Sequence, residues 1–417
     1  MKKIILFLIY LLFFFILMSS VCGADLNSTD NPLEIHAEDS VISTDVSETF
    51  DNLRKAINIS NQISLTSDII NTDEYEIFIG NGQNITINGN GYVIDGNKIG
   101  RLFTIYKGGQ LTLINAKLTN GYLPFYLDSD YDGGAIINNG ILIINDCEFY
   151  DNYAHNGGAI AAGIEATTIL SGTNYFHNNN VWQDGGAIAN FGGSTLIIRG
   201  NNTFESNNAF FTGTAVIPVD EGKGGAIINA FASPDNPNKK SYLYIEGENI
   251  FKQNIVNSDG AAIFNHQAIA NITGKNTFVG NFGVHKYSKG GAINNENATL
   301  YLSGDNIFRA NKAYRGGAID NNLFESIMTI DGKNQFIDNT GNMGGAISNQ
   351  ESTRLNIYGE NTFTNNKANF GDGANIGGAI YSYKSYLNID AKNTFMNNNA
   401  AGSGGAIYFA NNLFSMK

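Results

Sequence analysis

The stretch Asn306-Ile-Phe-Arg-Ala-Asn-Lys-Ala-Tyr-Arg-Gly-Gly-Ala-Ile319 contains both motifs that decide the fold. The first is Phe-x-x-Asn, at Phe308 and Asn311, and the second is Gly-Gly-Ala-Ile. The second motif recurs at ten positions, one of which reads Gly-Ala-Ala-Ile (Gly260), and its copies start at Gly133, Gly157, Gly185, Gly224, Gly260, Gly290, Gly316, Gly344, Gly377 and Gly404. Nine intervals span 271 residues, about 30 residues each, and this period is typical of stacked supersecondary units.

Each unit holds short apolar stretches and no long helical pattern. The Phe-x-x-Asn motif precedes nearly every glycine pair, with its aromatic residue at Phe149, Phe176, Phe204, Phe251, Phe278, Phe308, Phe336, Phe363 and Phe395. A short β stretch such as Leu300 to Leu302 lies upstream of each Phe, and no ten residues follow a 3.6 period. The absence of a helical period argues against leucine-rich, ankyrin and other solenoids that contain helices. We predict an all-β fold, a right-handed single-stranded parallel β-helix of the pectin-lyase-like type.

Because neighbouring turns would stack about 4.8 Å apart, equivalent residues of successive turns are expected to form ladders. The Phe and Ile positions are expected to point inward, each contributing about 1.5–3 kcal/mol by burial. The Asn two residues before each Phe is expected in a left-handed turn, hydrogen-bonded to its equivalents above and below. Cys147 occupies that slot in the first copy, which predicts a buried residue rather than a reactive thiol. The paired glycines predict positive φ or close backbone approach.

The chain divides into four predicted segments. Residues 1–23, with Lys2 and Lys3 before an apolar run and small residues at its end, are typical of a signal peptide; an uncleaved membrane anchor is the alternative. Residues 24–46 form a polar leader, 47–130 an N-terminal cap with the first coils, and 131–417 the β-helix repeats. Ser47 is the expected N-cap of a short helix that buries Phe50, Leu53 and Ile57 and covers the first coil.

The composition of the chain restricts the kinds of molecule that it is expected to bind. The chain has 25 Lys and Arg against 38 Asp and Glu, a net charge of −13, which disfavours nucleic acid and anionic lipid as partners. No second hydrophobic span follows the signal, so no membrane span is expected after its removal. Glycosylation sequons suit an exported chain and lie at Asn27, Asn58, Asn84, Asn201, Asn271 and Asn297. Asn84 and Asn271 are equally compatible with ladder or turn positions.

The loop before each glycine pair varies in length, from eight residues (Phe149 to Gly157) to twenty (Phe204 to Gly224). Variable loops at one place in a repeat gather on one face, which solenoids use for binding. The candidate ligand-facing aromatic residues of these loops are Trp182, Phe210, Phe211, Phe282, Tyr287, Tyr314 and Phe370. We expect them to contact a glycan or a protein; packing onto the coil below is the alternative.

The motif pair resembles the repeats of chlamydial polymorphic outer membrane proteins. The stretch Ile85-Thr-Ile-Asn-Gly-Asn-Gly-Tyr-Val-Ile-Asp-Gly96, followed by Arg101 to Ile105 and Leu111 to Asn115, resembles the opening of adhesin-like surface proteins of methanogenic archaea. Together these resemblances cover about Phe50 to Leu413. They imply a β-helix at the cell surface with a role in attachment. In the chlamydial proteins the two motifs are themselves linked to adhesion, whereas the residues predict core and turn positions for them.

An enzyme is the main rival interpretation, because many β-helices are polysaccharide lyases or hydrolases. Such sites need neighbouring carboxylates or carboxylates with Arg or Lys. Asp128, Asp130 and Asp132 form an acidic cluster that suits calcium or a cleft, but a solvated loop explains it better. The histidines are scattered, so no zinc site is predicted. We expect no catalytic residues, no cofactor and no metal.

The predicted function is therefore an exported, secreted or cell-surface, adhesin-like protein that mediates attachment or surface display without catalysis. Its expected partner is a surface glycan or protein of another cell or of host material. An uncapped last coil near Ile407 would favour end-to-end self-association. Two alternatives stay open: a polysaccharide-processing lyase or hydrolase, and a purely structural surface-layer component.

Overall fold

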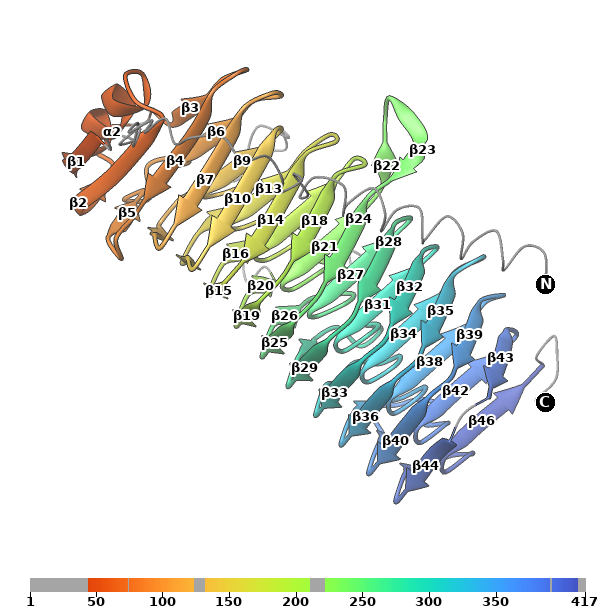
Figure 1. Cartoon of the computed structure of the whole chain (residues 1–417). Helices are drawn as coiled ribbons and strands as arrows, with labels where there is room; N and C mark the ends of the chain where they lie inside the picture. Colours follow the sequence, from red (N-terminus) through yellow and green to blue (C-terminus); the bar gives the residue numbers. More distant parts are fainter. Residues whose placement is uncertain (1–43, 74, 124–131, 211–221, 391, 412–417) are drawn as a thin grey trace, which may run out of the picture. The chain divides into compact units, whose positions relative to one another are not determined.

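A computed structural model describes residues 44–73, 75–123, 132–210, 222–390 and 392–411, and these form a parallel β-solenoid (Figure 1). Among these residues one helix occurs, α2 (Phe50–Ile57), and nearly all other regular structure is β-strand. The predicted class, a right-handed parallel β-helix with a short N-terminal capping helix, is confirmed. Within the same residues, no helix has both the length and the apolar character needed to cross a membrane.

The strands that follow the glycine pairs and the equivalent early strands form one 12-stranded sheet, here called the Gly-Gly-Ala-Ile sheet. Its strands, in stacking order, are β3 (Ile77–Ile79), β6 (Phe103–Ile105), β9 (Ile136–Asn138), β13 (Ile160–Ala162), β17 (Ile188–Phe191), β21 (Ile227–Ala230), β27 (Ile263–His266), β31 (Ile293–Glu296), β34 (Ile319–Asn322), β38 (Ile347–Gln350), β42 (Ile380–Tyr383) and β46 (Ile407–Ala410).

A 24-stranded sheet consists of two columns. The first column contains β1 (Thr44–Thr49), β2 (Gln62–Ile70), β4 (Asn84–Asn88), β7 (Gln110–Ile114), β10 (Ile141–Asn145), β14 (Thr167–Ser171), β18 (Thr195–Ile198), β24 (Tyr242–Ile245), β28 (Ile269–Ile272), β32 (Thr299–Leu302), β35 (Ile327–Ile330), β39 (Arg354–Ile357) and β43 (Tyr386–Ile389). The second, which carries the Phe motif, contains β5 (Val93–Asp95), β8 (Lys117–Thr119), β11 (Glu148–Tyr150), β15 (Thr173–His177), β19 (Asn201–Glu205), β25 (Glu248–Lys252), β29 (Lys275–Val279), β33 (Asp305–Arg309), β36 (Lys333–Ile337), β40 (Glu360–Thr364) and β44 (Lys392–Met396).

Short strands continue the stack after the Phe motif. They are β12 (Tyr153–Ala154), β16 (Asn180–Val181), β20 (Asn208–Ala209), β26 (Ile255–Val256) and β30 (Phe282–Gly283), then β37 (Thr340–Gly341), β41 (Lys367–Ala368) and β45 (Asn399–Ala400). A projecting antiparallel hairpin is formed by β22 (Ala232–Ser233) and β23 (Asn236–Lys240) (Figure 1).

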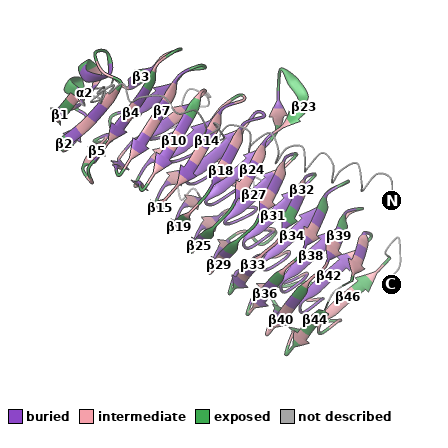
Figure 2. Ribbon diagram, viewed as in Figure 1, coloured by how far each residue is buried: buried purple, intermediate pink, exposed green. Residues whose placement is uncertain are grey.

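In the interior, equivalent positions of successive repeat turns stack the same kind of side chain. Phe308 of β33 is fully buried and stacks on Phe278 at 4.7 Å and on Phe336 at 4.9 Å, centroid to centroid, with nearly parallel rings. Ile319 of β34 pairs with Ile293 and Ile347 in the neighbouring turns. Along strands of the 24-stranded sheet such as β33, buried residues alternate with more exposed ones (Figure 2), as a period of two requires. In the Gly-Gly-Ala-Ile sheet, strands such as β34 are buried at every position. The Phe and Ile motifs therefore form the core, as predicted.

Buried amides form continuous hydrogen-bonded ladders. Asn306 Nδ2 donates to Asn334 Oδ1 at 2.8 Å, so the ladder predicted at the position two residues before Phe is confirmed. The left-handed conformation predicted there is wrong, because Asn306 lies inside β33 with its amide buried. Positive φ falls instead two residues after Phe, at Ala310 (φ 53°), where the chain leaves the strand. Cys147 occupies its ladder slot as predicted, and burial raises the pKa of its thiol to about 11.

A second amide ladder follows the last residue of the Phe-x-x-Asn motif. Asn311 Nδ2 donates to Asn339 Oδ1 at 3.1 Å and to the Phe278 carbonyl at 2.9 Å, while its own Oδ1 accepts from Asn281. All its polar atoms are thus satisfied by equivalent residues of adjacent turns, and its side chain is fully buried. Phe308 and Asn311 are core residues and not surface contacts.

The two glycines of each pair serve different purposes. Gly316 has φ 56°, a left-handed backbone conformation that most residues other than glycine adopt only with strain. At Gly317 a Cβ atom would collide with the Gly345 carbonyl of the next turn. Both expectations for the glycine pair are confirmed at this turn.

The N-terminal cap differs in detail from the prediction. Thr49, not Ser47, is the N-cap of α2, and its Oγ1 accepts from the Asn52 N–H at 3.1 Å. Ser47 belongs to β1, which begins at Thr44, so the solenoid starts before the predicted boundary at residue 47. Phe50, Leu53 and Ile57 are buried as expected.

Replacing Asn311 by Ala is expected to lower the free energy of unfolding by about 2 kcal/mol or more, because buried partners of the amide lose their hydrogen bonds. Urea unfolding followed by circular dichroism measures the change. Arg309→Ala, on the exposed side of β33, is the matched control and should change stability by less than about 0.5 kcal/mol. Equal effects of the two substitutions would contradict the ladder's role.

Candidate ligand-binding site

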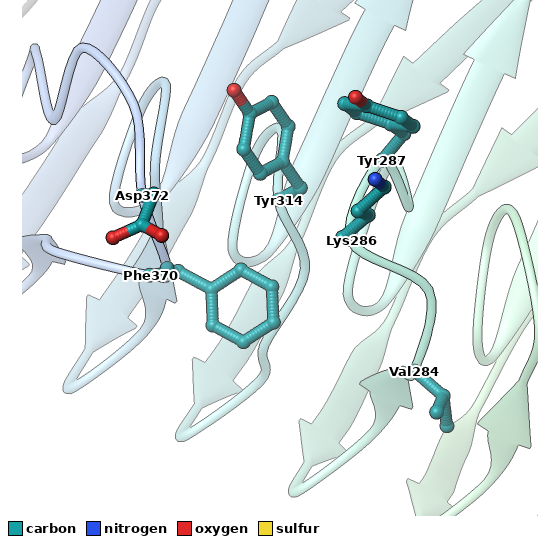
Figure 3. A pocket seen from close by; sticks show the side chains of 7 residues that line it. Val284, Lys286, Tyr287, Tyr314, Phe370 and Asp372 are labelled. Atoms are coloured by element: carbon teal, nitrogen blue, oxygen red, sulfur yellow. The ribbon is translucent and has the colours of Figure 1, made fainter.

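Differences in loop length create a notch along one face of the solenoid. The loop from Phe278 to Gly290 and the loop from Phe363 to Gly377 are long, whereas the two loops between them, after Phe308 and Phe336, are short. Two tall loops therefore stand on either side of two low turns. Figure 3 shows the result, with Tyr287 and Lys286 on one side, Tyr314 in the middle, and Phe370 and Asp372 on the other side.

The notch is an open pocket with a volume of about 470 Å³. Its lining combines three aromatic rings, one cation and one carboxylate with smaller groups; the residues are Val284, Lys286, Tyr287, Tyr314, Phe370, Gly371 and Asp372. Tyr287 is 59% exposed, so its ring can meet a ligand without rearrangement. The volume lies within the range of small-molecule pockets.

The aromatic rings are arranged edge to face. The rings of Tyr287 and Tyr314 meet at 5.7 Å and 85°, and those of Phe282 and Phe370 at 6.5 Å and 88°. Lys312 Nζ lies 4.6 Å from the centroid of Phe370 and 5.3 Å from that of Phe282, a cation–π contact with both. These contacts hold the rings in place before a ligand arrives.

Buried polar groups fix the loops beneath the rings. Ser288 Oγ donates to the Gly283 carbonyl at 3.0 Å and accepts from the Tyr314 N–H at 3.2 Å, so it joins the first tall loop to the next turn. Asn342 Nδ2 donates to the Phe370 carbonyl at 3.0 Å and to Asn375 Oδ1 at 2.9 Å, which anchors the second tall loop. Ser288 and Asn342 are fully buried. The walls of the pocket are therefore preorganised.

The candidate aromatic residues divide into two groups. Tyr287, Tyr314 and Phe370 line the pocket, and Phe282 contacts the Phe370 ring edge to face. Trp182 instead stacks on His155 of an adjacent turn at 5.7 Å, which fits the alternative of packing on the neighbouring coil.

The other two candidates do not line this pocket. Phe210 is half-buried on an earlier turn, and Phe211 lies outside the described residues.

The sequence analysis missed Val284, Lys286 and Asp372, because it selected only aromatic residues of the loops. The one available signal was the alternation of long and short loops, which locates the notch without naming its polar residues.

The predicted glycosylation positions differ in exposure. Asn58, Asn84, Asn201 and Asn297 are exposed, and Asn271 is half-buried on the outer side of β28 between Tyr244 and Tyr301. Asn27 lies outside the described residues. Modification at these sites stays a prediction.

The acidic cluster that the sequence offered as a possible calcium site or cleft is described only in part. Asp132 Oδ1 accepts from Asn156 Nδ2 at 3.0 Å, while Asp128 and Asp130 lie outside the described residues. In the described part of the chain, no group of three or more His, Cys, Asp or Glu side chains is placed to hold a metal ion. The predicted absence of cofactor and metal stays a prediction.

One of the comparisons with known proteins finds the repeat that the sequence predicts. The Chlamydia polymorphic membrane protein (Chlamydia_PMP) repeat matches residues 362–383 and 394–410, which contain two copies of the motif pair. One solved structure, L. reuteri 53608 SRRP, is similar over 85% of this chain and 99% of that chain, at 15% identity and a TM-score of 0.35, values that carry no functional information. No curated protein matches the chain. The resemblance to methanogen adhesin-like proteins stays a prediction.

Replacing Asn342 by Ala is expected to loosen the second tall loop, because the Phe370 carbonyl and Asn375 lose their buried partner. Limited chymotrypsin digestion followed by mass spectrometry should show faster cleavage at Phe370 than in the wild-type protein. Asn356→Ala, on the half-exposed side of β39, serves as the control. Unchanged cleavage at Phe370 would contradict the anchoring role of Asn342.

Proposed function

We propose that this chain is an exported, non-catalytic, adhesin-like surface protein that binds saccharide at the aromatic notch. The observation that carries the proposal is the group of preorganised rings of Tyr287, Tyr314 and Phe370 beside an open pocket of about 470 Å³. Aromatic faces pack against the apolar C–H faces of sugars, and nearby polar groups select their hydroxyls. The apolar start of the chain and the polymorphic membrane protein repeat support the surface location.

Binding rather than cleavage is supported by the charge pattern of the notch. Asp372 is the one carboxylate among its seven lining residues, and Lys286 is the one cation. Glycoside hydrolysis ordinarily uses two carboxylates on opposite sides of the bond. A single exposed carboxylate suits hydrogen bonding to hydroxyl or amide groups of a bound saccharide.

Binding should depend on the exposed rings of the notch. We expect the purified chain to retain a subset of saccharides on a glycan array, and Tyr287→Ala to weaken that binding by about tenfold, which corresponds to about 1.4 kcal/mol for one aromatic contact. Tyr301→Ala is the matched control, because Tyr301 is 47% exposed on β32 of the 24-stranded sheet and does not line the notch.

Different outcomes would separate the rival functions. Loss of binding in the Tyr301 variant with retention in the Tyr287 variant would place the site elsewhere. Release of shortened sugars from a bound polysaccharide would favour the enzyme alternative. No retention of any saccharide by a folded chain would favour a purely structural role.

A further inference from the structure

The charged side chains of the notch are separated along its length. Lys286 belongs to the first tall loop and Asp372 to the second, and both line the pocket. Figure 3 shows them on opposite sides of the opening, with the ring of Tyr314 between them. A ligand that spans the notch therefore meets a cation at one end, a carboxylate at the other end and aromatic rings between the two.

The ammonium group of Lys286 lies beside the most exposed ring of the pocket. Its Nζ is 5.0 Å from the centroid of the Tyr287 ring. In the described part of the chain, Lys286 forms no ion pair with a carboxylate, and its side chain is exposed. A cation–π contact at an exposed site is weak, so the ammonium group can turn toward an anion on a ligand that packs against Tyr287.

A second ammonium group lies next to the Phe370 ring. Lys312 is exposed, its Nζ contacts the rings of Phe282 and Phe370, and it forms no ion pair with a described carboxylate. At the base of the loops, in contrast, Lys289 and Arg315 have carboxylate partners. The notch is therefore surrounded by two cations without a carboxylate partner and by one carboxylate, although the chain as a whole has a net charge of −13.

Two features of the chain oppose the binding of an anion. The first is the net charge of −13, but at physiological ionic strength interactions between exposed charges are largely screened beyond about 8 Å. The second is Asp372 on the second tall loop. Because repulsion falls with distance, an anionic group is favoured at the Lys286 end, and Asp372 is left to accept hydrogen bonds from hydroxyl groups.

We propose that the notch selects an anionic saccharide and that Lys286 determines this preference. The inference rests on the proposed function, because it concerns the same site. A sugar ring packs against Tyr287, its carboxylate or sulfate group accepts hydrogen bonds from the Lys286 ammonium group, and hydroxyl groups at the far end donate to Asp372. An ammonium group suits either anion, because it acts as a compact charge with three donors and requires no planar arrangement of acceptors.

The rings and the lysine contribute differently to this binding. Tyr287, Tyr314 and Phe370 contact apolar C–H faces, which neutral and anionic sugars share. Lys286 contacts the charged substituent, so it discriminates between the two kinds of sugar. Removal of the lysine charge is therefore expected to abolish the preference and to leave binding of a neutral saccharide intact, whereas removal of the Tyr287 ring weakens both.

A glycan array printed with matched pairs tests the preference on the full chain. One pair is an oligosaccharide of glucuronic acid and its methyl ester, which has the same rings without the charge; the other is a sulfated galactose oligosaccharide and its unsulfated form. At low salt the anionic member of at least one pair should bind about tenfold more tightly than its neutral partner, the size of one charge-assisted hydrogen bond. The preference should shrink at about 1 M salt, where the screening length is about 3 Å.

Substitutions at Lys286 separate charge from packing. Lys286→Gln should bind the anionic and the neutral member of a pair equally, and Lys286→Arg should keep the preference because it keeps the positive charge. Lys333→Gln is the matched control, since Lys333 is exposed on β36, does not line the notch and carries the same charge. It should leave the preference unchanged.

The possible outcomes distinguish this inference from the proposed function. Equal affinity of the wild-type protein for both members of each bound pair would overturn the inference and leave saccharide binding in place. A preference that persists in folded Lys286→Gln protein would overturn the role of Lys286. A preference within one pair only would support the proposal and identify the anionic group. No binding of any saccharide by folded protein, as judged by circular dichroism, would overturn the proposed function and this inference together.

Discussion

Unbroken parallel register between successive turns is the constraint on which the rest of the structure depends. A buried amide such as Asn311 is tolerated because the next turn supplies a carbonyl and a second amide at hydrogen-bonding distance. Without that partner, each buried polar group would cost about 1–3 kcal/mol. The same spacing of about 4.8 Å between strands matches the stacking distance of the Phe rings. The same spacing between turns thus allows both the hydrogen bonds of the buried amides and the stacking of the Phe rings.

Register also explains where the molecule can vary. Strand residues must match their neighbours above and below, so a change of length within a strand would shift every later contact. The loops between the short strand after the Phe motif and the paired residue before the glycines are free of this requirement. The notch around Tyr314 arises where two short loops lie between two long ones. The notch is therefore formed on a regular scaffold by differences in loop length, and hydrogen bonds of Ser288 and Asn342 hold its walls.

The charged column before the glycine pairs shows how one repeat position accommodates charged side chains. Successive turns place Asp184, Lys223, Asp259, Lys289 and Arg315 one after another, so opposite charges alternate along the first four residues and two cations meet at the last step. Within this column, Lys289 Nζ and Asp259 Oδ2 form an ion pair at 3.5 Å. At one turn Glu296 adds a second carboxylate, 3.2 Å from Lys289 Nζ.

The sequence alone determined the features that repeat. The period of about 30 residues, the buried Phe and Ile stacks, the Asn ladders and the role of the glycine pair follow from residues that meet their own equivalents one turn away. Features that do not repeat were decided by the tertiary structure. The N-cap at Thr49 rather than Ser47, the extended conformation of Asn306, the meeting of Tyr287 with Tyr314 but not Trp182, and the Lys289–Asp259–Glu296 triad depend on loop paths and side-chain directions. Periodicity identifies which residues stack, but it contains no information on how unequal loops bend toward one another.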